Sequence, residues 1–263
     1  MISSSVPNGL PKDDVWSIAA IGLLAMCLVT IDHEALGHGG MCLALGGHIL
    51  ELTSSIFRCD LHSRWIAPAG PFANLAMGTT ALLVLRFTAS RSVRARLFLI
   101  LVAALSYFWE AGYAIHAMHL RDGDMYFAGQ DFLGEPSLGW RIAGAALGLA
   151  LFVFTARWVW RAMLELWIGD LTLARRAARI LWVSATLGAV GAALGYRGAG
   201  FSDLRDAALE IGASAFPLLW MPSRGAVQRN AHAEIIGRDT RLIAAALLIY
   251  TVFVATLGRG LFA

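Results

Sequence analysis

Charged residues are scarce in this chain of 263 residues: Asp, Glu, Lys and Arg make up 15% of it, and Lys12 is the one lysine. Hydrophobic residues make up 58%, which excludes an ordinary water-soluble globular protein. Cysteine occurs three times at irregular spacing, a pattern that predicts neither a disulfide framework nor a cysteine metal site. The net charge of +3 comes from arginines beside apolar runs, so we expect no binding to nucleic acid.

Several uncharged runs approach 20 residues, about the length that crosses the ~30 Å hydrocarbon core of a bilayer. We therefore predict an all-α polytopic membrane protein in contact with lipid, as one membrane domain over residues 1–263. The first 14 residues are polar, with no charged n-region and no small-residue cleavage site after the first apolar run, which predicts a retained span. Six spans are predicted, with a seventh at 207–221 that Glu210 and Pro217 interrupt. The six are about 15–45, 65–87, 97–119, 140–160, 180–196 and 242–257.

Arginine-rich segments at 86–96, 157–179 and 224–241 predict which side of the membrane each loop occupies. If all three are cytoplasmic, the chain has seven spans and a cytoplasmic N-terminus. The ends of the first and third spans then meet on the opposite side. We expect a bacterial cytoplasmic membrane.

An unusual group of polar residues closes the uncharged run 15–31: Asp32, His33, Glu34 and His38. Ionisable residues at such a depth are costly and indicate a functional site. Two histidines beside a glutamate are typical of zinc hydrolases, in which imidazoles hold Zn²⁺ and the carboxylate takes a proton from water.

The spacing of the two histidines is i and i+5. At ~100° per residue, an ideal α-helix would separate His33 and His38 by roughly 140°, too far to share one ion. We therefore predict a π-bulge, which absorbs one extra residue, and Gly37, Gly39 and Gly40 make local unwinding inexpensive.

Three other interpretations compete with a protease. Glu34 and His38, at i and i+4, would share a face of an undistorted helix and could be the ligands of a non-proteolytic metal-binding protein. A buried polar cluster that only pins helices together is a second possibility, and a catalytically inactive relative that binds partners is a third. A transporter is disfavoured, because the polar residues lie near one end of their spans.

Three landmarks, in this order, resemble those of the site-2 protease family of intramembrane zinc metalloproteases. They are His33-Glu34 with Gly37-His38, Ala69-Gly70-Pro71 with Asn74, and Asp122-Gly123. The resemblance covers about 15–130, a metalloprotease-like core, and leaves 131–263 as additional transmembrane helices. It implies two His and one Asp on Zn²⁺, a Glu base, and an endopeptidase that cleaves a transmembrane segment of a membrane protein or peptide. The family's Asn-x-x-Pro stretch is absent.

Two aspartates compete as third ligand. The family's Asn lies eight residues before the ligand Asp; counting back eight from Asp124 reaches His116, whereas the Asp-Gly pair favours Asp122. By chemistry, Glu34 is the general base, and His116 or Asn74 stabilises the oxyanion or holds the substrate.

Two further features stay open at this point. Glu110 is expected to be a buried partner of a polar neighbour or, alternatively, the third ligand. Residues 48–61 predict a short β-hairpin or, equally, a loop; a strand there could pair with an unwound substrate.

Overall fold

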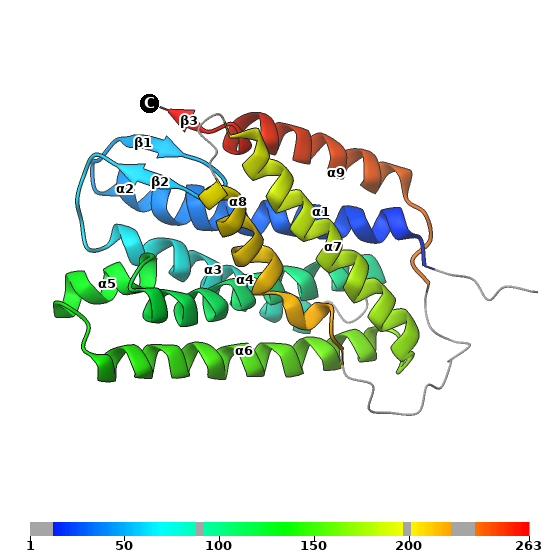
Figure 1. The fold of residues 1–263 in the computed structure, drawn as a ribbon. Coiled ribbons are helices and arrows are strands. Elements are labelled where there is room, and N and C mark those ends of the chain that lie inside the picture. The colour runs from blue at the N-terminus through cyan, green and yellow to red at the C-terminus, as the bar shows by residue number, and fades with distance from the viewer. Residues whose placement is uncertain (1–12, 88–91, 197–200, 222–234, 263) are drawn as a thin grey trace, which may run out of the picture.

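The computed structural model describes residues 13–87, 92–196, 201–221 and 235–262, which form a helical bundle with one small sheet (Figure 1). The elements are α1 (Val15–Thr30), η1 (Ile31–Gly39), α2 (Gly40–Ala44), β1 (Ile49–Leu52), β2 (Phe57–Cys59), α3 (Ile66–Arg86), α4 (Val93–Leu120), α5 (Asp124–Leu133), α6 (Leu138–Leu166), α7 (Leu171–Gly195), α8 (Phe201–Ala207), η2 (Ala208–Ala213), η3 (Phe216–Leu218), α9 (Thr240–Phe253), η4 (Val254–Gly258) and β3 (Leu261–Phe262).

Six helical stretches of the described chain are long and apolar enough to cross a membrane, as predicted. They are Val15–Ala44, Ile66–Arg86, Val93–Leu120, Leu138–Leu166, Leu171–Gly195 and Thr240–Gly258. The chain is thus an all-α multi-pass membrane protein with a short hairpin after its first span. The fifth predicted span is helix α7, which begins at Leu171 and not at residue 180. Asp170 caps this helix by accepting hydrogen bonds from the backbone N–H groups of Thr172 and Leu173.

The interrupted candidate at 207–221 forms no continuous helix, because α8 gives way to the π-helical η2 and then to η3, which contains Pro217. It still runs back along α7. Trp182 Nε1 donates to the carbonyl of Gly212 at 2.8 Å, and Arg175 Nη2 donates to that of Met221 at 3.0 Å. The seventh predicted span is therefore an interrupted helical segment (α8, η2 and η3) that runs antiparallel to α7 and is called the α8–η2 passage below.

Helix α4 is central in the bundle. It packs against α1, α3 and α6, and its Phe108 and Trp109 are fully buried. Figure 1 shows α1 and α9 on one side of it and α6 on the other. Gly148 of α6 allows the approach to α4, since a Cβ there would lie 2.8 Å from the carbonyl oxygen of Ala111.

The described residues of the three arginine-rich segments lie at one end of the bundle, with the start of α1 (Figure 1). There Arg94 Nη1 contacts Asp239 Oδ2 at 2.8 Å, and Asp13 accepts a hydrogen bond from the backbone N–H of Ile236. Residues 222–234 of the third arginine-rich segment lie outside the described residues. The common position of the described arginine-rich residues agrees with the expectation that these segments lie on one side of the membrane.

The hairpin lies at the opposite end. Strands β1 and β2 pair antiparallel, β3 pairs with the other edge of β1, and the order is β2-β1-β3. The strand alternative for 48–61 is confirmed. A disulfide joins Cys42 of α2 to Cys59 of β2, a pairing that the irregular spacing of the three cysteines did not indicate. The hairpin folds back toward α2, which brings Cys59 to Cys42. The spacing of the cysteines in the sequence does not predict this contact.

Candidate metal centre

The His-Glu motif lies in η1, the π-helical segment between α1 and α2. A π-turn holds one residue more than an α-turn, so side chains five apart share a face. The Nε2 atoms of His33 and His38 lie 3.2 Å apart, with ring centroids separated by 4.9 Å. The predicted distortion is present, and it is longer than a single bulge, extending over nine residues.

Glycines bring η1 against α3. A Cβ at Gly37 would lie 2.6 Å from the Cα of Gly70 and 2.8 Å from the carbonyl oxygen of Ala69. A Cβ at Gly70 would lie 2.7 Å from His33 Nε2 and would collide with His38 Nε2. The backbone of the Ala69-Gly70-Pro71 element therefore packs directly against both imidazole rings. The sequence did not predict this contact.

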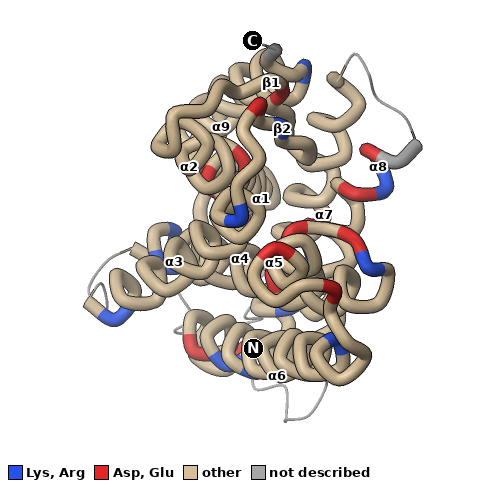
Figure 2. The backbone as a smooth tube through the Cα atoms, turned by 90° about the vertical axis from the view of Figure 1, so that its left-hand side faces the viewer, with Lys and Arg blue, Asp and Glu red and all other residues tan. Residues whose placement is uncertain are grey.

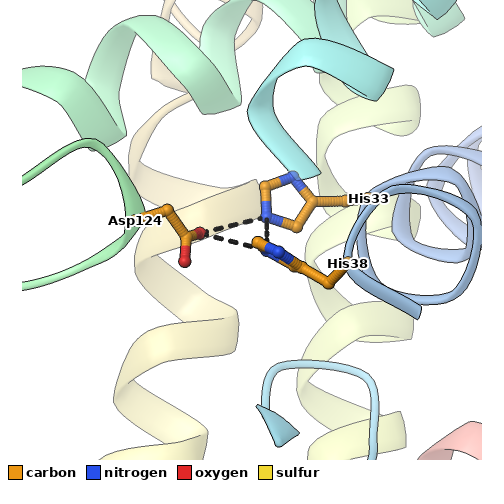
Figure 3. Close-up of side chains that lie close together, drawn as sticks. All are labelled: His33, His38 and Asp124. Carbon is orange, nitrogen blue, oxygen red and sulfur yellow. Dashed lines mark hydrogen bonds and ion pairs between the residues drawn. The ribbon is translucent and has the colours of Figure 1, made fainter. Parts of the chain in front are cut away.

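Asp124 is the first residue of α5 and reaches the imidazoles from the opposite side (Figure 3). Its Oδ2 lies 3.4 Å from His33 Nε2 and 3.3 Å from His38 Nε2. The preceding turn needs Gly123, which has φ +88° and whose Cβ would meet Tyr113 Oη at 2.5 Å. Burial acts to raise the pKa of the Asp124 carboxyl, but hydrogen bonds from His33 and His38 outweigh it, so the pKa lies below its ordinary value.

The three donor atoms fit one tetrahedral ion. Zn–N and Zn–O bonds of about 2.0–2.1 Å imply tetrahedral edges of about 3.3–3.4 Å, and the observed separations are 3.2, 3.3 and 3.4 Å. Two imidazole nitrogens and one carboxylate oxygen form a typical catalytic zinc set, which leaves a fourth position open. The other metal-type group in the described chain includes Cys42 and Cys59, whose sulfurs are bonded to each other.

Glu34 follows His33 in η1 and is buried, with 4% of its surface exposed. Within the described residues its carboxylate makes no hydrogen bond or ion pair. Buried polar groups are normally paired, so Glu34, which directly follows His33 in the chain, is an unusual buried carboxylate.

Glu110 and Asn74 lie behind His33. His33 Nδ1 donates to Glu110 Oε1 at 3.1 Å, and Asn74 Nδ2 donates to the same oxygen at 2.8 Å. With its proton on Nδ1, His33 presents the lone pair of Nε2 to a metal. Of the two expectations for Glu110, the structure shows the buried partner. Asn74 Nδ2 also lies 3.0 Å from His33 Nδ1, so Asn74 is on the Nδ1 side of the ring and not on the Nε2 side that faces Asp124.

His38 is held in the same way. Its Nδ1 donates to the carbonyl oxygen of Ile66 at 2.8 Å, which leaves Nε2 for a metal. The rings also have stacking partners: Trp109 lies 4.5 Å from His33 and Phe57 lies 5.5 Å from His38, centroid to centroid. Phe57 belongs to β2, so the hairpin covers one side of the centre.

Asp122 and His116 are not part of the three-donor group. Asp122 Oδ1 accepts a hydrogen bond from the backbone N–H of Gly123 at 2.9 Å, and both side chains line a neighbouring cavity. His116 stacks on Tyr113 at 6.5 Å. The structure thus brings Asp124, and not Asp122, to the histidines, because the turn at Gly123 points the two carboxylates in different directions.

Comparisons with known proteins identify no relative: no family model, no curated protein and no solved structure matches this chain.

Proposed function

We propose that this protein is an intramembrane zinc-dependent endopeptidase of the site-2 protease type, which hydrolyses a peptide bond in or near a transmembrane segment. One observation carries the proposal. His33 Nε2, His38 Nε2 and Asp124 Oδ2 lie at the corners of a tetrahedral face, next to the unpaired carboxylate of Glu34. The convergence of the histidines favours this reading over a metal held by Glu34 and His38.

The chemistry follows from these residues. When bound, Zn²⁺ would polarise the scissile carbonyl and acidify water. Glu34 accepts a proton from the attacking water as its oxygen bonds to the carbonyl carbon, and donates that proton to the leaving amine as the C–N bond breaks. Glu110 and Asn74 keep His33 in one tautomer throughout.

The hairpin offers a place for an unwound substrate strand. Strand β2 is at the edge of the sheet, with β1 as its one partner in the described chain. Its Phe57 stacks on the ligand His38. A substrate strand added at this edge would run past the metal centre with its backbone hydrogen-bonded.

The disulfide supports the orientation given by the arginines. Disulfides persist in oxidising compartments such as the bacterial periplasm, and Cys42–Cys59 lies at the end of the molecule opposite the arginine-rich segments. We therefore place the arginine-rich end in the cytoplasm and the metal centre near the outer face of a bacterial cytoplasmic membrane.

Metal content tests the centre. We expect about one zinc per chain in the detergent-purified wild type and in Asp122→Ala, and loss of zinc in His33→Ala, His38→Ala and Asp124→Ala, measured by elemental analysis. Asp122→Ala is the matched control, since it removes a carboxylate two residues away that does not touch the histidines. Zinc that survives Asp124→Ala and His33→Ala would overturn the assigned ligand set.

Proteolysis tests the activity. Wild type and Glu34→Gln are each incubated in proteoliposomes with a library of single-span peptides, and the products are identified by mass spectrometry. Glu34→Gln should keep its zinc and lose turnover by roughly 10²–10⁴-fold, the usual contribution of a general base. Zinc-loaded wild type that cuts no peptide, or cuts as Glu34→Gln does, would contradict a protease and favour an inactive, partner-binding relative.

A further inference from the structure

The cavity that Asp122 and His116 line lies beside the metal centre. Its volume is about 290 Å³, and its walls come from the hairpin turn, α4, the turn before α5, α6 and the α8–η2 passage. This is just below the range of ~300–1,000 Å³ that is common for small-molecule sites. The cavity has room for one long side chain.

The wall of this cavity has more acidic than basic side chains. Arg205 pairs with Asp206, with Nη2 2.8 Å from Oδ1, so these two cancel. Asp122 and Glu210 also line the cavity, and neither has a basic partner in the described residues. Apart from His116, the wall therefore has three acidic side chains (Asp122, Asp206 and Glu210) and one basic side chain (Arg205). Figure 2 shows acidic residues gathered at this end of the molecule, on α5, α8 and the adjoining turns.

The cavity adjoins the proposed catalytic residues on two sides. Asp122 and Gly123 of its wall directly precede the ligand Asp124. Glu210 also lines a separate void of about 10 Å³ with Trp109, the residue that stacks on His33 at 4.5 Å. Glu210 therefore borders both the cavity and the void beside Trp109.

We propose that this cavity binds the lysine or arginine side chain of a substrate, close to the bond that is cut, and that Glu210 selects for its positive charge. The apolar stem would lie along Phe152 and Leu209 of the wall, with the cationic head at the carboxylates, as long basic side chains commonly do. The assignment to a cleaved substrate rests on the proposed function. The selectivity of the cavity for cations does not, so the two are tested separately.

Thiol labelling tests the charge selectivity without any catalysis. The native chain offers no reactive thiol, because Cys27 is buried and Cys42 is bonded to Cys59. Ala213→Cys places a thiol in the wall of the cavity. The measured quantity is a quotient: the rate at which a cationic trimethylammonium methanethiosulfonate modifies this thiol, divided by the rate for the anionic sulfonate methanethiosulfonate. The same quotient for an exposed thiol outside the cavity, at Leu133→Cys, corrects for the reagents.

We expect the corrected quotient to exceed one and to fall roughly tenfold when Glu210→Gln is added, as one charge at close range implies. Glu135→Gln, which removes a carboxylate outside the cavity, should leave the quotient unchanged. Ser55→Cys, also on the wall, gives a second reading if Ala213→Cys does not fold. A quotient near one, or one insensitive to Glu210→Gln at both positions, would overturn the proposal.

Peptide cleavage tests the link to substrate. In single-span peptides cut by the wild type, residues around the cut are replaced one at a time by lysine or norleucine. The ratio of kcat/KM for lysine over norleucine should exceed ten at one position and fall at least tenfold in Glu210→Gln. If labelling is selective for the cationic reagent but the rate of cleavage does not depend on lysine, the assignment of the cavity to a substrate side chain is refuted and the proposed function is not. Absence of any zinc-dependent cutting would refute the proposed function and the substrate assignment together, while the labelling result would stand.

Discussion

The helices that carry the metal centre and the helices added after it differ in what surrounds them. In the most apolar stretch of each span, 61% of the residues are buried in Val15–Ala44 (α1, η1 and α2) and 67% in α4, against 22% in α6 and 22% in Thr240–Gly258 (α9 and η4). The first two of these spans hold both histidines, Glu34 and Glu110 of the centre, whereas the last two spans present apolar side chains outward.

This difference shows which positions are constrained by atomic fit. A lipid-facing residue needs only to be apolar, since the hydrocarbon adapts to its shape. Residues around the imidazoles must place donor atoms to within a few tenths of an ångström, and a buried polar group without its partner is costly. Substitutions of the same kind should therefore have very unequal effects in the two regions.

The largest effect is expected for Gly70→Ala. The added methyl would collide with His38 Nε2 and lie 2.7 Å from His33 Nε2, so the two imidazoles cannot keep their positions. We expect zinc affinity to fall by roughly 100-fold or more, the scale of losing a metal ligand's orientation altogether. Competition with a zinc-binding dye measures it.

Gly40→Ala is the control for Gly70→Ala. It adds the same methyl directly after η1, but the nearest atom would be the carbonyl oxygen of Ala35 at 4.0 Å. Its zinc affinity should equal that of the wild type. Equal loss in both variants would mean that helix flexibility, and not the space above Gly70, decides metal binding.

A smaller loss is expected behind His33. Glu110→Ala removes the acceptor of His33 Nδ1–H, and loss of such an outer partner costs about 10–100-fold in metal affinity. Glu110→Gln keeps an acceptor oxygen and should recover part of the affinity. Glu165→Ala, an exposed carboxylate on α6, serves as control. An affinity unchanged in Glu110→Ala would remove this residue from the centre.

Opening the disulfide should affect the hairpin more than the metal. Cys42 and Cys59 are 17 residues apart, and closing a loop of about that length stabilises a fold by about 3 kcal/mol. In the Cys42→Ser/Cys59→Ser double variant, limited proteolysis should cut residues 48–61 faster, while zinc affinity falls less than tenfold. Reductant should reproduce this in the wild type and add nothing in the variant. Equal protease resistance in all four samples would contradict a tethering role.

The smallest effect is expected on the outer face. Leu248→Ala on α9, where 66% of the side chain's surface is exposed, should change stability in detergent by less than about 0.5 kcal/mol. Leu101→Ala in α4, which is 1% exposed, should cost about 2–5 kcal/mol through the cavity it leaves. Thermal unfolding of both variants in the same detergent measures the two losses of stability. Similar losses would contradict the difference in packing between the two regions.

Much of the fold could be predicted from the sequence because hydropathy and length act locally. The six spans and the distortion between His33 and His38 each follow from residues near one another in the chain, whereas the residues at 48–61 left a hairpin and a loop as equal alternatives. The helix starts also have local causes, as at Ser92 and Ser137, whose side chains accept hydrogen bonds from the backbone N–H groups of Ala95 and Trp140. The broken passage at 207–221 was visible only as a weak span with Glu210 and Pro217 inside it.

The sequence by itself determined that this chain crosses a membrane several times and that His33, Glu34 and His38 form a polar group at the end of an apolar span. Only the tertiary structure decided that Asp124 and not Asp122 joins them, that Glu110 and Asn74 stand behind His33, and that Cys42 pairs with Cys59. The physical reason is that a helical period fixes which face a residue occupies, whereas contacts between distant segments depend on turns and close approaches, such as those at Gly123 and Gly70.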